Sequence, residues 1–187
     1  MGDTAPKSIS GLDALNAATA NGFYYVTGLG GSSFGGVSVV QGLLLVIGKD
    51  SYHTDHYFFP AGTDTVLWRE MESQVWGEWC CLNPPMTLGV EYRTTERWQG
   101  KAVYVKSIHA GSLMADGTIN IPITGATDPY ILRHTAQLGR HALPLNYYDI
   151  WTDVQFASAT NFLLLMHCGT ASLVGGTLYV TIWYTKN

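Results

Sequence analysis

The sequence predicts an all-β protein, and three observations lead to this fold class. The 21 glycines among the 187 residues are spread along the chain as turn punctuation, without the period of three that indicates collagen. Between the turns lie short segments that are rich in β-branched and aromatic residues, and several of them alternate apolar and polar side chains. Helical spacing is confined to one short segment, so we expect strands joined by tight turns.

The first half of the chain is expected to begin with one helical turn and to continue as short strands. Residues 11–18 combine apolar spacing with good helix formers, and Asn21-Gly22 supplies a C-terminal stop. The apolar run at residues 42–47 is bounded by glycine and is too short for a typical helix. The expected strands of this half are residues 23–27, 42–47, 57–59, 65–69 and 74–79.

A double proline divides the chain into two predicted domains, residues 1–83 and 84–187. Neither Pro84 nor Pro85 can donate a hydrogen bond to a sheet, and each pushes the preceding residue into extended geometry. Strands at short spacing follow in the second domain and indicate a β-sandwich. They are expected at residues 103–108, 118–123, 154–156, 162–166 and 177–184.

The longest loop-like region is the stretch 125–148, which lacks clear periodicity. Long loops on β-scaffolds often carry function. Sugars present apolar C–H faces together with hydroxyl groups, so lectin sites combine an aromatic platform with Arg, Asp or His partners. Such residues cluster in and just after this stretch, and they are the candidate ligand-binding residues: Tyr130, Arg133, His134, Arg140, His141, Tyr147, Tyr148, Asp149 and Trp151. The alternative is that Tyr147 and Trp151 belong to the core and that the arginines pair across subunits.

The charge balance argues against nucleic acid as a partner. The net charge is −4, and no run of Lys or Arg is available to neutralise a phosphate backbone. The first ten residues lack the apolar core of a secretory signal, and no apolar run reaches membrane-spanning length. We therefore expect a soluble protein that is made in the cytoplasm and does not insert into a membrane.

No metal and no cofactor are expected. Cys80 and Cys81 are adjacent and Cys168 stands alone, which is neither a disulfide framework nor a CxxC metal site, so all three are interpreted as small hydrophobic residues. His53 and His56 precede a strand, where their spacing places them on different faces. A histidine on a three-fold axis could hold an ion, but the sequence lacks a His-x-His pattern.

Two blocks of the sequence resemble modules of bacteriophage tail fibres. In the first half, residues 12–16, the early Gly22-Phe23-Tyr24 and the closing pair Trp76 and Trp79 are similar to the pyocin-knob domain of phage and R-type pyocin fibres. In the second half, residues 89–106 (GVEYRTTERWQGKAVYVK) and 180–186 (VTIWYTK) resemble the C-terminal module of prophage-encoded fibres. The resemblance implies a knob domain followed by a β-sandwich at the tip of a virion tail fibre, made in the bacterial host cytoplasm and attached to other tail-fibre or baseplate proteins.

A homotrimer is expected from the composition as well as from the resemblance. With 47% hydrophobic and only 13% charged residues, the chain has few polar side chains to cover its own surface. On a strand over residues 177–184, Tyr179 and Trp183 face away from the core, and Trp76 and Trp79 are expected to point to opposite faces of one strand. The candidate subunit-interface residues are Tyr92, Arg93, Arg97, Trp98, Tyr179 and Trp183.

The predicted function is attachment of a phage tail fibre to a bacterial surface glycan or related polymer, without catalysis. A glycoside hydrolase needs two facing carboxylates, and the few carboxylates of the second half show no such pair. Nucleophile elbows and nucleotide-binding loops are absent from the sequence. The alternatives are a structural fibre or collar segment without a ligand and, third, a capsule depolymerase.

The double proline generates a prediction about folding units. Because few sheet hydrogen bonds can cross Pro84 and Pro85, limited proteolysis should cut between residues 80 and 90 and leave two stable fragments. Mass spectrometry of the digest identifies the cut. Recovery of one indivisible core, with no stable fragment of either half, contradicts the prediction.

Overall fold

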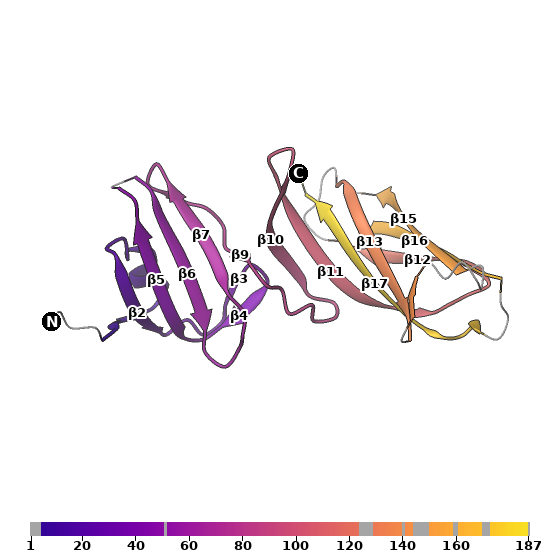
Figure 1. The fold of residues 1–187 in the computed structure, drawn as a ribbon, viewed down its shortest axis with the longest axis horizontal. Coiled ribbons are helices and arrows are strands. Elements are labelled where there is room, and N and C mark those ends of the chain that lie inside the picture. The colour runs from indigo at the N-terminus through magenta and orange to yellow at the C-terminus, as the bar shows by residue number, and fades with distance from the viewer. Residues whose placement is uncertain are drawn as a thin grey trace. The chain divides into compact units, whose positions relative to one another are not determined.

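The all-β fold class predicted from the sequence is confirmed by the structure, a computed structural model. It describes residues 5–50, 52–123, 129–139, 141–143, 150–158, 161–169 and 173–186, with only the backbone at His141 and Phe156. The chain divides into two compact units, Met1–Pro85 with Tyr92–Thr95, and Met86–Glu91 with Glu96–Asn187. Figure 1 shows strands throughout both units. In the part of the chain that the structure describes, no helix is long and apolar enough to cross a membrane.

The first unit is built on a seven-stranded sheet with the order β1-β2-β5-β6-β7-β8 and with β9 paired to β7. The helix α1 (Leu12–Asn16) lies where the sequence predicts it, and β3 and β4 form a separate hairpin. All five expected strands have counterparts, although only the start of 74–79 is a strand. The strands are β1 (Lys7–Ser10), β2 (Gly22–Thr27), β3 (Ser32–Phe34), β4 (Val37–Val39), β5 (Gly42–Gly48), β6 (Thr54–Pro60), β7 (Leu67–Glu72), β8 (Val75–Trp76) and β9 (Cys80–Cys81).

One face of this sheet forms the core of the first unit. Alternate side chains of the central strands are buried, and the segment that contains α1 lies against them, since Tyr24 donates a hydrogen bond from Oη to the carbonyl oxygen of Ala20 at 2.7 Å. The β3–β4 hairpin covers the same face, because Phe34 meets Phe58 edge to face at 5.7 Å. The fully or nearly fully buried apolar residues include Leu15, Tyr24, Val26, Leu44, Val46, Phe58 and Leu67.

A buried cation lies at one side of this core. Arg69 is 5% exposed, and its guanidinium carbon lies 4.1 Å from the ring centroid of Trp76 and 4.4 Å from that of Trp79. The sequence-based prediction that the two tryptophans point to opposite faces is therefore wrong. β8 ends at Trp76, and the backbone turns at Gly77, whose N–H donates to the carbonyl oxygen of Glu70 at 2.8 Å, so Trp79 returns to the same side.

His56 ties this cation to the helical segment. Arg69 donates to Nδ1 of His56 from Nε at 3.3 Å and from Nη2 at 3.1 Å. Because Nδ1 accepts, the imidazole proton is on Nε2, which donates to the carbonyl oxygen of Ala18 at 2.6 Å. Burial is the main cause that lowers the pKa of His56 to about 4, and burial lowers the pKa of Arg69 to about 9. The neutral imidazole is thus part of the fold.

The second unit is a two-sheet sandwich. A five-stranded sheet has the order β10-β11-β17-β13-β14, and a three-stranded sheet has the order β12-β16-β15. Their facing side chains, among them Phe162 and Leu164 from one sheet and Leu178 and Val180 from the other, make one core. The strands are β10 (Glu91–Trp98), β11 (Lys101–Ser112), β12 (Asp116–Pro122), β13 (Ile131–Leu138), β14 (His141–Leu143), β15 (Ile150–Ser158), β16 (Asn161–Cys168) and β17 (Thr177–Thr185).

One sequence-based expectation about the second unit is corrected, and one strand was not expected. Residues 125–148 are not one loop, because β13 and β14 lie within them, and β13 pairs along β17. A register shift between Ile131 and Arg133 interrupts the alternation of β13, which hides the strand in the sequence. The block before the Gln99-Gly100 turn is also a strand, β10, and both turn residues have the positive φ typical of a two-residue hairpin loop.

The last strand has the two faces that its sequence predicts. Leu178, Val180, Ile182 and Tyr184 are buried in the sandwich core, and the residues between them, which include Trp183, face outward. All three cysteines are buried as well, as expected for small hydrophobic residues. The alternation of apolar and polar residues along β17 therefore decides which of its side chains face outward and are available for binding.

The buried neutral imidazole of His56 predicts a pH-dependent stability of the first unit. The pKa of His56 is about 4 in the folded chain and about 6.5 when unfolded, so the unfolded state binds the proton first as the pH falls. Stability is full above pH 6.5 and should drop by about 2 kcal/mol between pH 7 and pH 5. Urea denaturation followed by tryptophan fluorescence measures this difference.

The matched control for this prediction is His56→Phe, which keeps a ring in the core but cannot titrate. The variant should be less stable at pH 7, because Arg69 and the Ala18 carbonyl lose their partner. Its stability should nevertheless change less between pH 7 and pH 5 than that of the wild type. An equal pH dependence in both proteins would assign the effect to other histidines among the six of the chain.

Candidate functional site

The outer face of the five-stranded sheet gathers aromatic, hydroxyl, amide and charged side chains. Strand register places them in rows, since residues directly opposite each other on paired strands share a face. Arg133 of β13 lies beside Trp183 of β17, and Gln137 lies beside Tyr179. Thr181 is flanked by Thr135 on one side and by Ser107 of β11 on the other. This set of side chains, which we call the outer-face site, comes from three strands.

A pocket of about 330 Å³ lies within the outer-face site. Strand β17 supplies one aromatic ring and one hydroxyl group to its wall, and β13 supplies a hydroxyl and an amide group. A small apolar residue of β14 completes the wall. Such a wall offers an apolar platform beside hydrogen-bond donors and acceptors. The lining residues are Thr135, Ala136, Gln137, Ala142, Tyr179 and Thr181.

Neighbouring side chains on β11 hold the pocket wall in place. Ser107 Oγ and Thr181 Oγ1 are hydrogen-bonded at 2.8 Å, which orients the threonine. The ring of Tyr179 lies 5.3 Å from that of His109, with an angle of 43° between the ring planes. Because all four residues stand on strands that are paired over nearly their whole length, the site is preorganised by the sheet.

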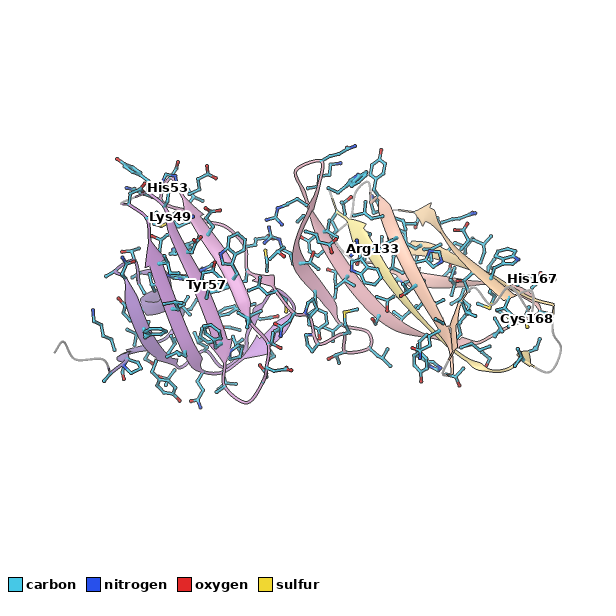
Figure 2. All side chains as sticks on the ribbon, viewed as in Figure 1. Lys49, His53, Tyr57, Arg133, His167 and Cys168 are labelled. Atoms are coloured by element: carbon cyan, nitrogen blue, oxygen red, sulfur yellow. The ribbon has the colours of Figure 1, made fainter. Side chains whose placement is uncertain are left out.

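Arg133 crosses the outer face next to the pocket, and Figure 2 labels it on this sheet. Its guanidinium carbon lies 4.6 Å from the ring centroid of Trp183, and its Nη2 donates to Glu96 Oε1 at 2.7 Å. The side chains of Arg133 and Glu96 remain 50% and 45% exposed, so water screens this ion pair and it contributes little to stability. The carboxylate nevertheless neutralises the cation, and the site carries little net charge.

One end of the same sheet is fastened by ionic and aromatic contacts. Lys101 Nζ lies 5.4 Å from the ring centroid of Tyr130, which is 54% exposed. Glu91 accepts hydrogen bonds from the Tyr184 hydroxyl and from Lys186 Nζ. Burial is the main cause that raises the pKa of Tyr184 far above its ordinary value, with the Glu91 carboxylate adding to it, so this phenol stays protonated and donates to Glu91.

The structure separates the candidate ligand-binding residues of the sequence analysis. Arg133 belongs to the five-stranded sheet, and Tyr130 immediately precedes its strand β13. His134 points between the sheets, with Nε2 3.2 Å from the carbonyl oxygen of Thr152. Trp151 lies on the outside of the three-stranded sheet and stacks on His167, with 5.7 Å between the two ring centroids. His141 has a described backbone in β14 but no described side chain. Arg140, Tyr147, Tyr148 and Asp149 lie outside the described residues.

The candidate subunit-interface residues also divide into groups. Tyr92 is 3% exposed, so little of it remains for a neighbouring subunit. Arg93 is used within the chain, since its Nη1 donates to the Glu78 carbonyl oxygen at 2.7 Å and its Nε lies 3.3 Å from the Glu78 carboxylate. The other four remain at least partly accessible: Arg97, Trp98, Tyr179 and Trp183.

Sequence reasoning missed five of the six residues of the pocket wall, and it predicted the sixth, Tyr179, as a subunit contact. Thr135, Gln137 and Thr181 were not predicted, because threonine and glutamine on a strand are common surface residues. The available signal was the alternation of polar residues at positions 133, 135 and 137, which matches the outward positions 179, 181 and 183 of the last strand. Only the pairing of β13 with β17 brings the two patterns together.

Histidines of the first unit have partners within the chain. His53 Nδ1 lies 2.9 Å from the Asp50 carboxylate, while His56 is held by Arg69 and Ala18. They face different surroundings, as their spacing on strand and turn predicts. Among the described residues, no three His, Cys, Asp or Glu side chains are grouped so that they could hold a metal ion.

A second pocket of the sandwich, of about 380 Å³, has a different chemistry. Its wall is mainly aliphatic, and its lysine, Lys106, donates from Nζ to the carbonyl oxygen of Pro122 at 2.9 Å. Such a wall lacks an aromatic platform beside hydroxyl groups, so it fits a polar ligand less well than the outer-face site does. The lining residues are Leu88, Gly89, Lys106, Ile108, His109, Ala110, Ile119, Asn120 and Pro122.

Comparison with known proteins gives loose structural likenesses. No protein-family model and no curated protein matches the sequence. An N-truncated R2-type pyocin tail fibre is similar over 95% of both chains, with 12% identity and a TM-score of 0.31. An R1 pyocin fibre of P. aeruginosa is similar over 100% of this chain and 68% of its own, with 10% identity and a TM-score of 0.36. An R2 pyocin fibre of P. aeruginosa gives 12% identity and a TM-score of 0.28 over 95% of this chain and 65% of its own. TM-scores at this level do not establish a shared fold.

Proposed function

We propose that this chain is the tip segment of a phage-type tail fibre and that it attaches to a bacterial surface glycan through the outer-face site. The observation that carries the proposal is the pocket in which Tyr179 stands beside Thr135, Gln137 and Thr181. The two sequence blocks that resemble fibre modules support the location on a virion tail and an association with other tail-fibre or baseplate proteins.

The pocket chemistry favours an uncharged sugar. The ring of Tyr179 offers an apolar surface for the C–H face of a pyranose, and hydroxyl and amide groups around it can exchange hydrogen bonds with sugar hydroxyls. Arg133 is the cation nearest along β13, and Glu96 already pairs with it. A strongly anionic polymer would have to compete with that carboxylate, so neutral sugars fit better.

Binding without catalysis is part of the proposal. Glycoside hydrolysis requires two carboxyl groups on opposite sides of the scissile bond, one of them protonated. The described residues that line the pocket include no carboxylate, and the nearby Glu96 is bound to Arg133. The described pocket wall therefore lacks the facing pair of carboxyl groups that hydrolysis requires.

Attachment by this site would depend on several copies acting together. A shallow sugar site of one chain binds weakly, while three identical sites on one fibre tip gain avidity without any new contact. We therefore propose a homotrimer as the working unit. The rival is a structural fibre segment without a ligand, and the observation that favours it is the pairing of Arg133 with Glu96 and Trp183, which uses polar groups of the outer face within the chain.

The glycan proposal predicts specific losses on substitution. Tyr179→Ala removes the stacking surface and Gln137→Ala removes the amide, so each should weaken binding to a glycan identified on a bacterial glycan array by about tenfold, which corresponds to about 1.4 kcal/mol. The melting temperature and the mass in solution should remain those of the wild type. Isothermal titration with the identified glycan measures the affinity.

Trp151→Ala is the matched control, because Trp151 is 43% exposed but lies on the other sheet of the sandwich. This variant should bind the glycan as the wild type does. Loss of binding in Trp151→Ala with no loss in Tyr179→Ala would place the site on the three-stranded sheet. Absence of binding to every glycan, in a folded and oligomeric protein, would favour the structural segment.

A further inference from the structure

The outer face of the five-stranded sheet continues beyond the pocket to the end of the β10–β11 hairpin. Lys101 lies an even number of residues before Ser107 on β11, so both side chains point to the same face. Ser107 bonds to Thr181 within the outer-face site. At a rise of about 3.4 Å per residue, Lys101 lies about 20 Å from Ser107 along the strand. Figure 1 shows the hairpin at the end of the sheet where β17 finishes.

Trp98 stands on the same face as Lys101. The two-residue loop Gln99-Gly100 joins β10 to β11, and the residues that flank such a loop, Trp98 and Lys101, lie opposite each other. Glu96, two residues before Trp98, reaches Arg133 on the outer face, which agrees with this register. The indole of Trp98 is 47% exposed, so it remains available to a ligand.

The ammonium group of Lys101 is positioned but not neutralised. Its Nζ lies 5.4 Å from the ring centroid of Tyr130, and an aromatic ring attracts a cation without cancelling its charge. Arg97, on the same hairpin, donates from Nη1 to the carbonyl oxygen of Glu96 at 3.2 Å. Among the residues that the structure describes, no carboxylate forms an ion pair with Lys101 or Arg97.

This end of the sheet is positively charged in an acidic chain. Residues 96–101 and 130–133 contain three cations, Arg97, Lys101 and Arg133, and one carboxylate, Glu96, which gives a net charge of +2. The whole chain carries a net charge of −4. A local excess of positive charge beside exposed rings attracts an anionic ligand.

We propose that Trp98, Lys101 and Tyr130 form an anion subsite, which binds a phosphate or carboxylate group on the polymer whose neutral sugars occupy the pocket. The two rings offer surfaces for the sugar that bears the acidic group, and Lys101 supplies the charge. The inference rests on the proposed function and adds a ligand class to it, a polysaccharide whose acidic substituents are separated by neutral sugars. Because the subsite lies about 20 Å from Ser107, only a chain of several sugar units contacts both places.

The experiment compares oligosaccharides that differ only in charge. The probes are chains of several units built on the glycan identified on the array, in a neutral form, a form with one phosphate and a form with one uronate. The wild-type chain should bind at least one acidic form roughly fivefold more tightly than the neutral form, and high salt should remove this preference. The phosphate and uronate arms show which anion the subsite takes. Isothermal titration measures each affinity.

Substitutions assign the preference to the subsite. Lys101→Met keeps an unbranched side chain without its charge, so it should abolish the preference and keep the affinity for the neutral form. Lys106→Met is the matched control, because Lys106 lies on the same strand but donates to the Pro122 carbonyl oxygen in the other pocket, and its preference should be that of the wild type. Tyr179→Ala should weaken the neutral and acidic forms by the same factor.

A polyanion tests the subsite even if no glycan occupies the pocket. At low salt the wild-type chain should bind dextran sulfate and not neutral dextran, and Lys101→Met should weaken this binding severalfold more than Lys106→Met does. Equal losses in the two lysine variants, or equal affinity for neutral and acidic oligosaccharides, would overturn the subsite. Full binding of the neutral form by Tyr179→Ala, with the Lys101 effect intact, would contradict only the assignment of the pocket.

Discussion

The pleat of the β-strand is the constraint on which both units depend. Successive side chains point to opposite faces, so a strand that fills a core with every second residue must present the others somewhere else. In the second unit Val180 and Ile182 fill the sandwich, and Thr181 and Trp183 therefore face outward beside β13. In the first unit the same rule buries Phe58 and exposes Phe59. Core and function are thus the two sides of the same strands.

Among the described residues, arginine and tryptophan meet in two places, with different consequences. In the first unit the guanidinium of Arg69 lies near two indole rings and bonds to a neutral imidazole, and burial lowers its pKa to about 9. In the second unit Arg133 lies over one indole ring at the surface and keeps a carboxylate partner. The buried contact contributes to the fold because its loss would leave polar groups without partners. The exposed contact can rearrange at little cost in free energy.

The sequence predicts what is local and misses what depends on pairing between distant strands. The helical turn α1 and the strands β5 and β17 follow from short-range spacing, glycine boundaries and alternation. β13 was missed because its start is irregular, with a register shift between Ile131 and Arg133, and the alternation that follows covers only positions 133–138. Tyr130 and Trp151 lie close in sequence but on different sheets, because β15 pairs with β16 and not with β13.

The outer-face site shows the same limit for function. Tyr179 was predicted as a contact between subunits, since the sequence shows only that it faces outward. Its neighbours Gln137 and Thr135 come from β13, and no spacing within either segment indicates that they meet. Trp76 and Trp79 were placed on opposite faces because a turn at Gly77 was not recognised. In each case the missing information is backbone hydrogen bonding that the local sequence does not show: the pairing of β13 with β17, or the turn bond between Gly77 and Glu70.

The outermost strands of the sheets have a consequence for crowded assemblies. The seven-stranded sheet ends in β1, with four residues, and β8, with two, and the five-stranded sheet ends on one side in β14, with three. Edges this short offer few open backbone groups, so the sheet of the first unit has little template on which to recruit a strand from another chain, whereas the edge strands β10, β12 and β15 of the second unit are seven to nine residues long. The first units of many copies held at high local density would then resist merging into continuous cross-β ribbons.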